Sequence, residues 1–429
     1  MDDTFLISFS GGDQPGLISS LAEILDQRGA RLLDVGQAVV HETLALGMLV
    51  RASSSTDTAR LEKDLRSRAE CLGLRVGFAP VSADGFDHWA NAQAKDRFVL
   101  TLLGREITAY QLFRVSAVIA ESGLNIDRIE RLSGRLSLVT PAEDSYACLE
   151  LHVSTGAQPS AMSAGESDAL ADQMRASLMA LTHELTLDIA FQKECVFRRN
   201  RRLFVFDMDS TLIAGEVIDE LAKLAGVGDQ VSAITAAAMR GELDFQQSFR
   251  ARVALLRGLP EERAQTVLNS VPLVQGAERL ISTLKRLGYK TAILSGGFNF
   301  FARDLQARLG VDYVFANDLD IAGGFVTGEV KTAIVDAQRK ADLLREIAAR
   351  ENIALGQVVA VGDGANDLPM LNIAGMGIAF HAKPLVRERA GNALSYLGLD
   401  SLLYLIGIRD RDLPGLTDDA TPVTDILCG

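Results

Sequence analysis

The chain has few cysteines, no long apolar run and no excess of positive charge, the features that mark secreted, membrane-spanning and nucleic-acid-binding proteins. Its four cysteines are scattered without a C-x-x-C pair, so we expect reduced thiols and a cytoplasmic protein. No apolar run approaches the roughly 18 residues of a membrane-spanning helix, and the residues after Met1 do not resemble a signal peptide. The net charge of −13 argues against nucleic acid or an anionic membrane as a partner.

Histidine is also scarce. The five histidines lie outside every motif described below, which argues against a phosphohistidine mechanism and against a histidine-rich zinc site. His381 lies nearest to a motif, and we assign it a structural role. A length of 429 residues allows about three domains, each large enough to bury a core.

The most informative segment is a short apolar run, residues 203–206, that leads directly into two carboxylates. The run is typical of a buried parallel strand. Asp207 and Asp209 can therefore emerge on one side of its carboxyl end, where open α/β sheets hold their ligands. Two adjacent carboxylates repel each other and favour a divalent cation with a phosphoryl group. An EF-hand is excluded because Leu212 and Ile218 stand where Gly and Glu are required. For this segment alone, a pair of solvated acids is the alternative.

Two further apolar runs end in polar residues. Residues 291–294 are followed by Ser295 and two glycines, and residues 358–361 lead to Asp363, while Lys340 lies between them in a helical pattern. Glycines let a backbone approach a phosphate closely, and N–H groups at a following helix start favour an anion. Each piece alone is weak. Acid, hydroxyl and acid at three strand ends in α/β order together predict one site.

These motifs resemble those of the haloacid dehalogenase superfamily of phosphotransferases and, more closely, the phosphoserine phosphatases within it. The residues that carry the resemblance are the Asp-Met-Asp-Ser-Thr segment from Asp207, Ser295, Lys340, the Gly-Asp-Gly-Ala-Asn-Asp segment from Gly362, and segments 216–220 and 245–253. The resemblance covers about residues 200–410. It implies an α/β class protein with a Rossmann-like core built on a parallel sheet and a small helical cap over about residues 214–272.

The resemblance also implies a role for each motif residue. Asp207 would be the nucleophile that forms an aspartyl-phosphate, and Asp209 the general acid and base. Mg²⁺, or Mn²⁺ in its place, would be held by Asp207, the backbone carbonyl of Asp209 and Asp363. The remaining implied roles are phosphate binding by Ser295, Gly296 and Lys340, substrate binding by Glu216, Met239, Phe245, Arg252 and Asn366, and support of the metal site by Asp367. The implied reaction is hydrolysis of O-phospho-L-serine to L-serine and phosphate, the last step of serine biosynthesis.

The chemistry of two cap residues agrees with an amino-acid substrate. An ammonium group pairs with a carboxylate such as Glu216, and a planar carboxylate pairs with a guanidinium such as Arg252. Each residue alone could be a surface charge. Two rival functions stay open: a phosphatase for phosphothreonine or a phosphorylated amine, and a catalytically silent amino-acid sensor. The complete motif set argues against the second.

The first 190 residues carry a βαββαβ pattern twice, which is typical of ferredoxin-like domains. We place the copies at residues 1–84 and 95–192, since residues 98–103 match residues 5–10. Their strand-Gly-turn-helix opening resembles ACT domains, which implies an amino-acid effector, for which we expect L-serine, and a homodimer. The candidate effector residues are Asp13, Pro15, Gly16 and Gly104. The second copy lacks the Asp-x-Pro-Gly turn, and the alternative is that both copies serve dimerisation alone.

Three segments are assigned to connections. Residues 158–165 are rich in Ser, Ala and Gly and predict a loop. Residues 193–202 contain five Lys or Arg, and in so acidic a chain we interpret them as an interdomain linker rather than a nucleic-acid contact. Residues 411–429 predict a loosely ordered tail.

Overall fold

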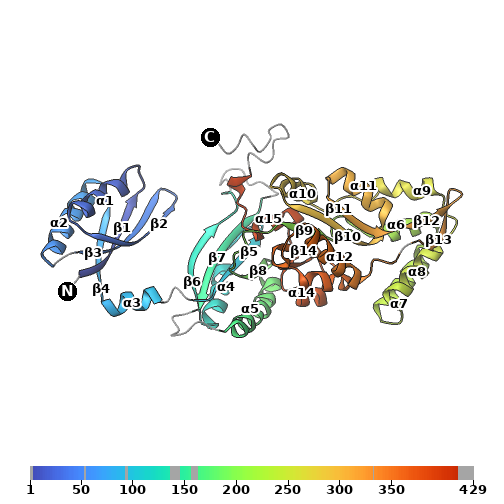
Figure 1. The fold of residues 1–429 in the computed structure, drawn as a ribbon, viewed down its shortest axis with the longest axis horizontal. Helices are drawn as coiled ribbons and strands as arrows, with labels where there is room; N and C mark the ends of the chain where they lie inside the picture. The colour runs from blue at the N-terminus through green and yellow to red at the C-terminus, as the bar shows by residue number, and fades with distance from the viewer. Residues whose placement is uncertain are drawn as a thin grey trace. The chain divides into compact units, whose positions relative to one another are not determined.

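The computed structural model describes residues 3–52, 55–91, 95–135, 145–155, 163–331 and 333–413. The chain divides into two compact units, one ending at Ala94 and the other beginning at Lys95 (Figure 1). Most of the predicted tail lies outside the described residues. None of the described helices is long and apolar enough to cross a membrane.

The first unit is the first βαββαβ copy, followed by one further helix. Its elements are β1 (Asp3–Gly12), α1 (Leu17–Gln27), β2 (Arg31–Val40), β3 (Thr43–Ala52), α2 (Ser55–Cys71), β4 (Arg75–Val81) and α3 (Ala83–Asn91). The strands form an antiparallel sheet in the order β2-β3-β1-β4. Alternate residues of β1, namely Phe5, Ile7 and Phe9, are buried in the same cluster as Leu21 of α1. The predicted ferredoxin-like fold is therefore confirmed for this copy.

The second copy repeats this topology at the start of the second unit. Its elements are β5 (Arg97–Gly104), α4 (Ala109–Glu121), β6 (Leu124–Arg131), β7 (Ala147–Thr155), α5 (Ala164–Leu185) and β8 (Asp188–Lys193), with the sheet order β6-β7-β5-β8. The helix α5 begins earlier than expected. Ser163 and Glu166 cap it reciprocally, so Ala164 and Gly165 belong to the helix and not to the predicted loop.

A six-stranded parallel sheet forms the rest of the second unit. Its order is β11-β10-β9-β14-β15-β16, and its strands are β9 (Leu203–Phe206), β10 (Lys290–Phe298), β11 (Tyr313–Asn317), β14 (Val358–Gly362), β15 (Met376–Phe380) and β16 (Ala393–Leu394). Phe204 and Phe206 join one hydrophobic cluster, while Leu203 and Val205 join another. The two faces of β9 are thus both covered, as its continuous apolar run predicted.

Helices cover this sheet and fill the segment between its first two strands. The helices of the core are α10 (Ala277–Arg286), α11 (Asn299–Leu309), α12 (Ala337–Arg350), α13 (Leu368–Ile373), α14 (Pro384–Ala390) and α15 (Leu402–Leu405). The cap segment holds α6 (Val217–Ala225), α7 (Gly228–Met239), α8 (Phe245–Leu255) and α9 (Glu261–Gln265). A hairpin of β12 (Leu319–Ala322) and β13 (Phe325–Val330), which the sequence analysis did not anticipate, packs on α8. Just after that helix, Gly258 N donates to Val326 O at 2.8 Å.

The second copy packs against the parallel-sheet core of this unit. Its residues Leu103, Tyr146 and Cys148 belong to the same hydrophobic cluster as Phe204 of the parallel sheet. The Asp188 carboxylate of β8 accepts hydrogen bonds from the backbone N–H groups of Ser395 at 2.6 Å and Tyr396 at 3.0 Å. Tyr146 donates to Asp400 at 3.2 Å, and Gln192 Nε2 donates to Leu405 O at 3.1 Å. These contacts form a buried polar seam between the two parts of this unit.

Candidate active site

The three strands that carry the motifs lie side by side at the centre of the parallel sheet. The register pairs Phe206, the last residue of β9, with Ile293 of β10 and with Val361 of β14. The residues that follow these positions therefore meet at one edge of the sheet, the carboxyl edge, where ligands of such sheets bind.

Lys340 links two of the predicted carboxylates. Its ammonium nitrogen lies 2.7 Å from Asp207 Oδ1 and 2.7 Å from Asp367 Oδ1, and its side chain is completely buried on α12. Burial alone would lower the pKa of Lys340, but the two carboxylates outweigh it and raise the pKa, so the ammonium stays charged. Met208 N also donates to Asp207 Oδ1 at 2.8 Å, which leaves Oδ2 without a hydrogen bond from the described residues.

The acidic residues around Lys340 carry an excess of negative charge. One oxygen from each of Asp207, Asp363 and Asp367 can be chosen so that all lie within 4.8 Å of one another. Burial and the neighbouring Asp367 raise the pKa of Asp207 well above its usual range and that of Asp363 to about 7. A single ammonium does not balance three carboxylates, so this group of oxygen ligands could hold a divalent cation.

Asp209 occupies a separate position beside this cluster. Its Oδ1 accepts a hydrogen bond from Val217 N at 3.1 Å, at the start of α6, and burial raises its pKa to about 7. A Cβ atom on Gly297 would lie 2.5 Å from Asp209 Oδ2. Glycine at 297 therefore lets the end of β10 approach the Asp209 carboxylate closely. With a pKa of about 7, Asp209 is protonated in part of the molecules at neutral pH.

The end of β10 is held in shape by a residue that the sequence analysis missed. Gly297 N donates to Ser295 Oγ at 2.8 Å. The buried Asn317, the last residue of β11, donates from Nδ2 to Gly296 O at 2.8 Å and accepts from Val335 N at 2.8 Å. A polar residue at the end of a strand next to the motif strands was the only sequence signal for this role.

Two charged residues of the cap segment face each other near the motif carboxylates. Arg252 of α8 has a side chain that is 11% exposed, and its Nη1 lies 3.9 Å from Glu216 Oε2. Its buried Nε has no hydrogen-bond partner among the described residues. Burial lowers the pKa of Arg252, and the charges of Glu216, Asp219 and Asp209 oppose that shift. The pair thus leaves a buried guanidinium donor available for an anionic group.

The three other predicted substrate residues lie on different elements. Phe245 stacks on Phe249 with ring centroids 6.1 Å apart, and its Cζ would lie 3.0 Å from a Cβ atom on Gly296, so its ring covers the end of β10. Asn366 lies in the single turn that follows β14. Met239 ends α7, and its side chain lies outside the described residues.

The candidate effector residues belong to different units. Asp13 and Pro15 are exposed in the turn after β1, and Gly16 begins α1 with a φ of 89°. Gly104 is buried in the second unit, where a Cβ atom would lie 2.5 Å from Leu187 Cδ2. Glycine at 104 thus has a packing role that is independent of any ligand, and its role in effector binding stays a prediction.

Comparisons with known proteins agree with this geometry. The haloacid dehalogenase-like hydrolase family matches residues 204–372, and two ACT domain families match residues 3–79 and 97–192. The chain resembles a solved haloacid dehalogenase-family hydrolase from Salmonella enterica serovar Typhi, at 32% identity and a TM-score of 0.59 over 72% of this chain and 99% of that one. A solved probable phosphoserine phosphatase from Vibrio cholerae gives 32% identity and a TM-score of 0.54 over 75% and 88% of the two chains. The fold and the site define a haloacid dehalogenase-like hydrolase that carries two ACT domains.

Full-length relatives narrow the class further. A phosphoserine phosphatase of Streptomyces coelicolor is 41% identical over 97% of this chain and 96% of its own length. One from Mycobacterium tuberculosis is 38% identical over 94% and 93% of the two chains. The chain belongs to the phosphoserine phosphatase family.

Proposed function

We propose that the chain hydrolyses O-phospho-L-serine to L-serine and phosphate through an aspartyl-phosphate on Asp207, and that this is the last step of serine biosynthesis. The observation that carries the substrate assignment is the cap pair of Glu216 and Arg252 beside the motif carboxylates, with a buried guanidinium Nε that has no hydrogen-bond partner in the described part of the chain. A phosphate ester, an ammonium and a carboxylate on one small molecule match the three charged features of this site.

The first half of the reaction belongs to Asp207. Lys340 and Met208 N hold Oδ1, so Oδ2 is the oxygen that attacks phosphorus and displaces the serine oxygen. The nucleophile is oriented before substrate arrives, because Lys340 is itself fixed by Asp367. Ser295, Gly296 and Lys340 bind the phosphoryl oxygens.

Asp209 moves the protons. With a pKa of about 7, it retains a proton in part of the molecules at neutral pH and donates it to the departing serine oxygen. The resulting carboxylate then accepts a proton from the water that hydrolyses the aspartyl-phosphate. Val217 N holds Oδ1 in both steps.

A divalent cation, Mg²⁺ or Mn²⁺, would be held by Asp207, Asp363 and the backbone carbonyl of Asp209, and it would offset the charge of the phosphoryl group. Asp367 supports this arrangement indirectly, since its Oδ1 contacts Lys340 and its Oδ2 accepts from Gly364 N at 3.0 Å. We expect a chelator to stop turnover, Mg²⁺ or Mn²⁺ to restore it and Ca²⁺ not to do so. Full turnover in excess chelator would contradict the metal assignment.

The substrate assignment is tested by removing the guanidinium. Arg252→Ala should lower kcat/KM for phosphoserine by about 10–100-fold, because a buried charge-assisted hydrogen bond is worth about 1.5–3 kcal/mol. Phosphoethanolamine, which keeps the amine and lacks the carboxylate, should lose much less. Arg250→Ala on the same helix is the matched control, since Arg250 is exposed. Equal losses on both substrates would show that Arg252 supports the fold or the phosphate and not the carboxylate.

We further propose that the ACT domains bind an amino acid, L-serine being the candidate, and that the protein is a homodimer. The exposed turn of Asp13 and Pro15 before α1 supports the first unit as the binding site. Asp13→Ala should weaken inhibition by L-serine and leave kcat unchanged in its absence. Unaltered inhibition in this variant, or a monomer in sedimentation, would remove the corresponding part of the proposal.

A further inference from the structure

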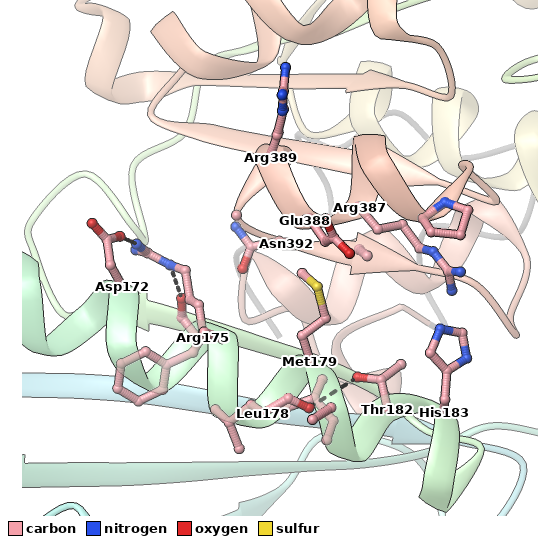
Figure 2. A pocket seen from close by; sticks show the side chains of 17 residues that line it. Asp172, Arg175, Leu178, Met179, Thr182, His183, Arg387, Glu388, Arg389 and Asn392 are labelled. Carbon is pink, nitrogen blue, oxygen red and sulfur yellow. Dashed lines mark hydrogen bonds and ion pairs between the residues drawn. The ribbon is translucent and has the colours of Figure 1, made fainter.

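A cavity of about 570 Å³ lies between the second ACT domain and the phosphatase core, outside the active site. One wall is the stripe of α5 that includes Arg175, Met179 and His183, and the opposite wall comes from the end of α14 and the start of β16 (Figure 2). Its volume is typical of small-molecule sites. Because its walls belong to the two parts joined by the polar seam, any occupant would contact both.

The cavity contains a buried polar atom without a partner. Asn392 lines it and is 9% exposed, and its Oδ1 accepts no hydrogen bond from the described residues. Figure 2 shows the Asn392 side chain between Arg175 and Met179, pointing into the space. Leaving a buried acceptor unsatisfied costs about 1–3 kcal/mol, so a ligand with an N–H or O–H donor would find a favourable place here.

A cationic group lies across the cavity from this acceptor. Arg387 of α14 extends toward His183 of α5 in Figure 2, and it has no ion-pair partner among the described residues. Its one hydrogen bond there is a long one of 3.5 Å to Ser395 Oγ. Arg175, in contrast, is already engaged by Asp172 and by Phe191 O. Among the described residues that line the cavity, Arg387 is thus a cationic group that no carboxylate engages, although Glu388 and Arg389 line it as well.

We propose that this cavity is a binding site for a small organic acid that also carries an N–H or O–H donor away from its carboxylate, the chemistry found among amino and hydroxy acids. The carboxylate pairs with Arg387, the donor satisfies Asn392 Oδ1, and the apolar part lies on Met179, Ile189 and Phe191. Binding in this cavity does not depend on the substrate proposed above, whereas its effect on Glu216 rests on that proposed function.

Such a ligand would be placed to influence substrate binding. The helix α14 is only seven residues long, and its end lines the cavity. Lys383, immediately before its first residue, lies close enough to Glu216 for its positive charge to act on that carboxylate. A ligand that prefers one position of α14 would therefore change the charge around the substrate's ammonium site.

The test uses the full-length protein and isothermal titration with each of the twenty free L-amino acids and with L-lactate, D-glycerate and L-malate. We expect at least one of these acids to bind saturably, and Asn392→Leu and Arg387→Ala each to weaken that binding by about ten-fold or more. Turnover of phosphoserine without added acid should stay unchanged in both variants. Arg345→Ala is the control, since Arg345 is exposed on α12 and does not line the cavity.

Variants distinguish binding in this cavity from binding at the active site or at the first ACT domain. Heat that disappears in Arg252→Ala or Asp13→Ala but persists in Asn392→Leu belongs to the active site or to the first ACT domain. Ala176→Phe, which fills the cavity from the exposed face of α5, provides a second block if Asn392→Leu fails to fold. Absence of binding by every acid, or binding that survives both Arg387→Ala and Ala176→Phe, would overturn the proposal.

Discussion

The two ACT domains have the same topology and opposite surroundings. Their sheets have equivalent strand orders, but β4 of the first copy is exposed or half-buried along its length, whereas β8 of the second is buried over five of its six residues. The strand register identifies one pair of equivalent positions at which the two copies differ. Arg75 pairs with Ser10 in the first copy, and Asp188 pairs with Leu103 at the equivalent place in the second. An exposed cation in one copy corresponds to a buried anion that joins the phosphatase core in the other.

This contrast shows that a repeated fold can take two different roles in one chain. The first copy has a hydrophobic cluster of its own, and all the described residues in that cluster belong to this copy. The second copy also has a cluster of its own, but it contributes further residues to the main cluster of the core. Figure 1 shows the same helix-and-strand succession in both. The second domain is therefore part of the enzyme's structural core, and the first is an independent unit.

The largest expected effect is a loss of turnover that leaves both ACT domains folded. Asp207→Asn should lower turnover by about 10⁴-fold or more, because the attacking carboxylate is lost. Thermal unfolding should still show both units folded. Rapid quenching with radiolabelled substrate should give no base-labile phosphoenzyme. Near wild-type activity in this variant would mean that the covalent scheme is wrong.

Deleting each ACT domain tests the comparison directly. A chain beginning at Lys95 should keep its kcat within about two-fold and keep the unfolding transition of the second unit. A chain beginning at Cys195 would expose the apolar residues that the core buries against the second copy, at a cost on the order of 5 kcal/mol. We expect it to aggregate or to unfold at a much lower temperature. If both deletions left activity and stability equally intact, the conclusion that only the second copy belongs to the structural core would be wrong.

A single side chain tests the seam at a finer level. Asp188→Ala leaves two half-buried backbone N–H groups without their acceptor and should destabilise the second unit by about 2–4 kcal/mol. Arg75→Ala, at the matched position of the first copy, should change stability by less than about 0.5 kcal/mol. Urea unfolding of the two variants measures the difference. Equal losses of stability in the two variants would show that Asp188 stabilises its domain no more than Arg75 does at the matched position.

The smallest expected effect is a pH dependence of the same seam. Burial raises the pKa of Asp188 to about 6, against hydrogen bonds from Ser395 and Tyr396 that lower it. A carboxyl with a raised pKa in the folded state contributes most stability at low pH and loses it as the pH rises through about 6. The stability gap between wild type and Asp188→Ala should therefore be about 2 kcal/mol larger at pH 4.5 than at pH 7. A gap that is constant with pH would contradict the assigned shift.

The parts of the fold that local patterns encode could be predicted from the sequence. The strand-end residues Asp207, Ser295 and Asp363 follow apolar runs, and parallel strands bring such ends to one edge. The two βαββαβ copies were visible in the same way, and their fold is confirmed. The assigned catalytic roles stay predictions until the variants are measured.

What escaped prediction depends on partners far apart in the chain. Asn317 has no motif of its own, and its role comes from Gly296 and Val335, which the fold brings to it. The Arg198–Glu150 ion pair joins a linker residue to β7 and is almost completely buried, whereas the sequence analysis assigned residues 193–202 to an interdomain linker and named no partner for Arg198. Side chains that act through tertiary contacts leave no periodic signal in the sequence.

The seam joins parts of the chain that are synthesised at different times, so β8 stays uncovered for an interval during translation. Asp188 and its partner Ser395 are separated by 207 positions, so β8 emerges from the ribosome long before the residues that will cover it. At about 5–20 residues per second, the uncovered edge strand persists for roughly 10–40 seconds. During that interval the charges of Asp188 and Lys193 at its two ends disfavour pairing with other chains. The residue that later fixes the domain in place thus protects it while the rest of the protein is made.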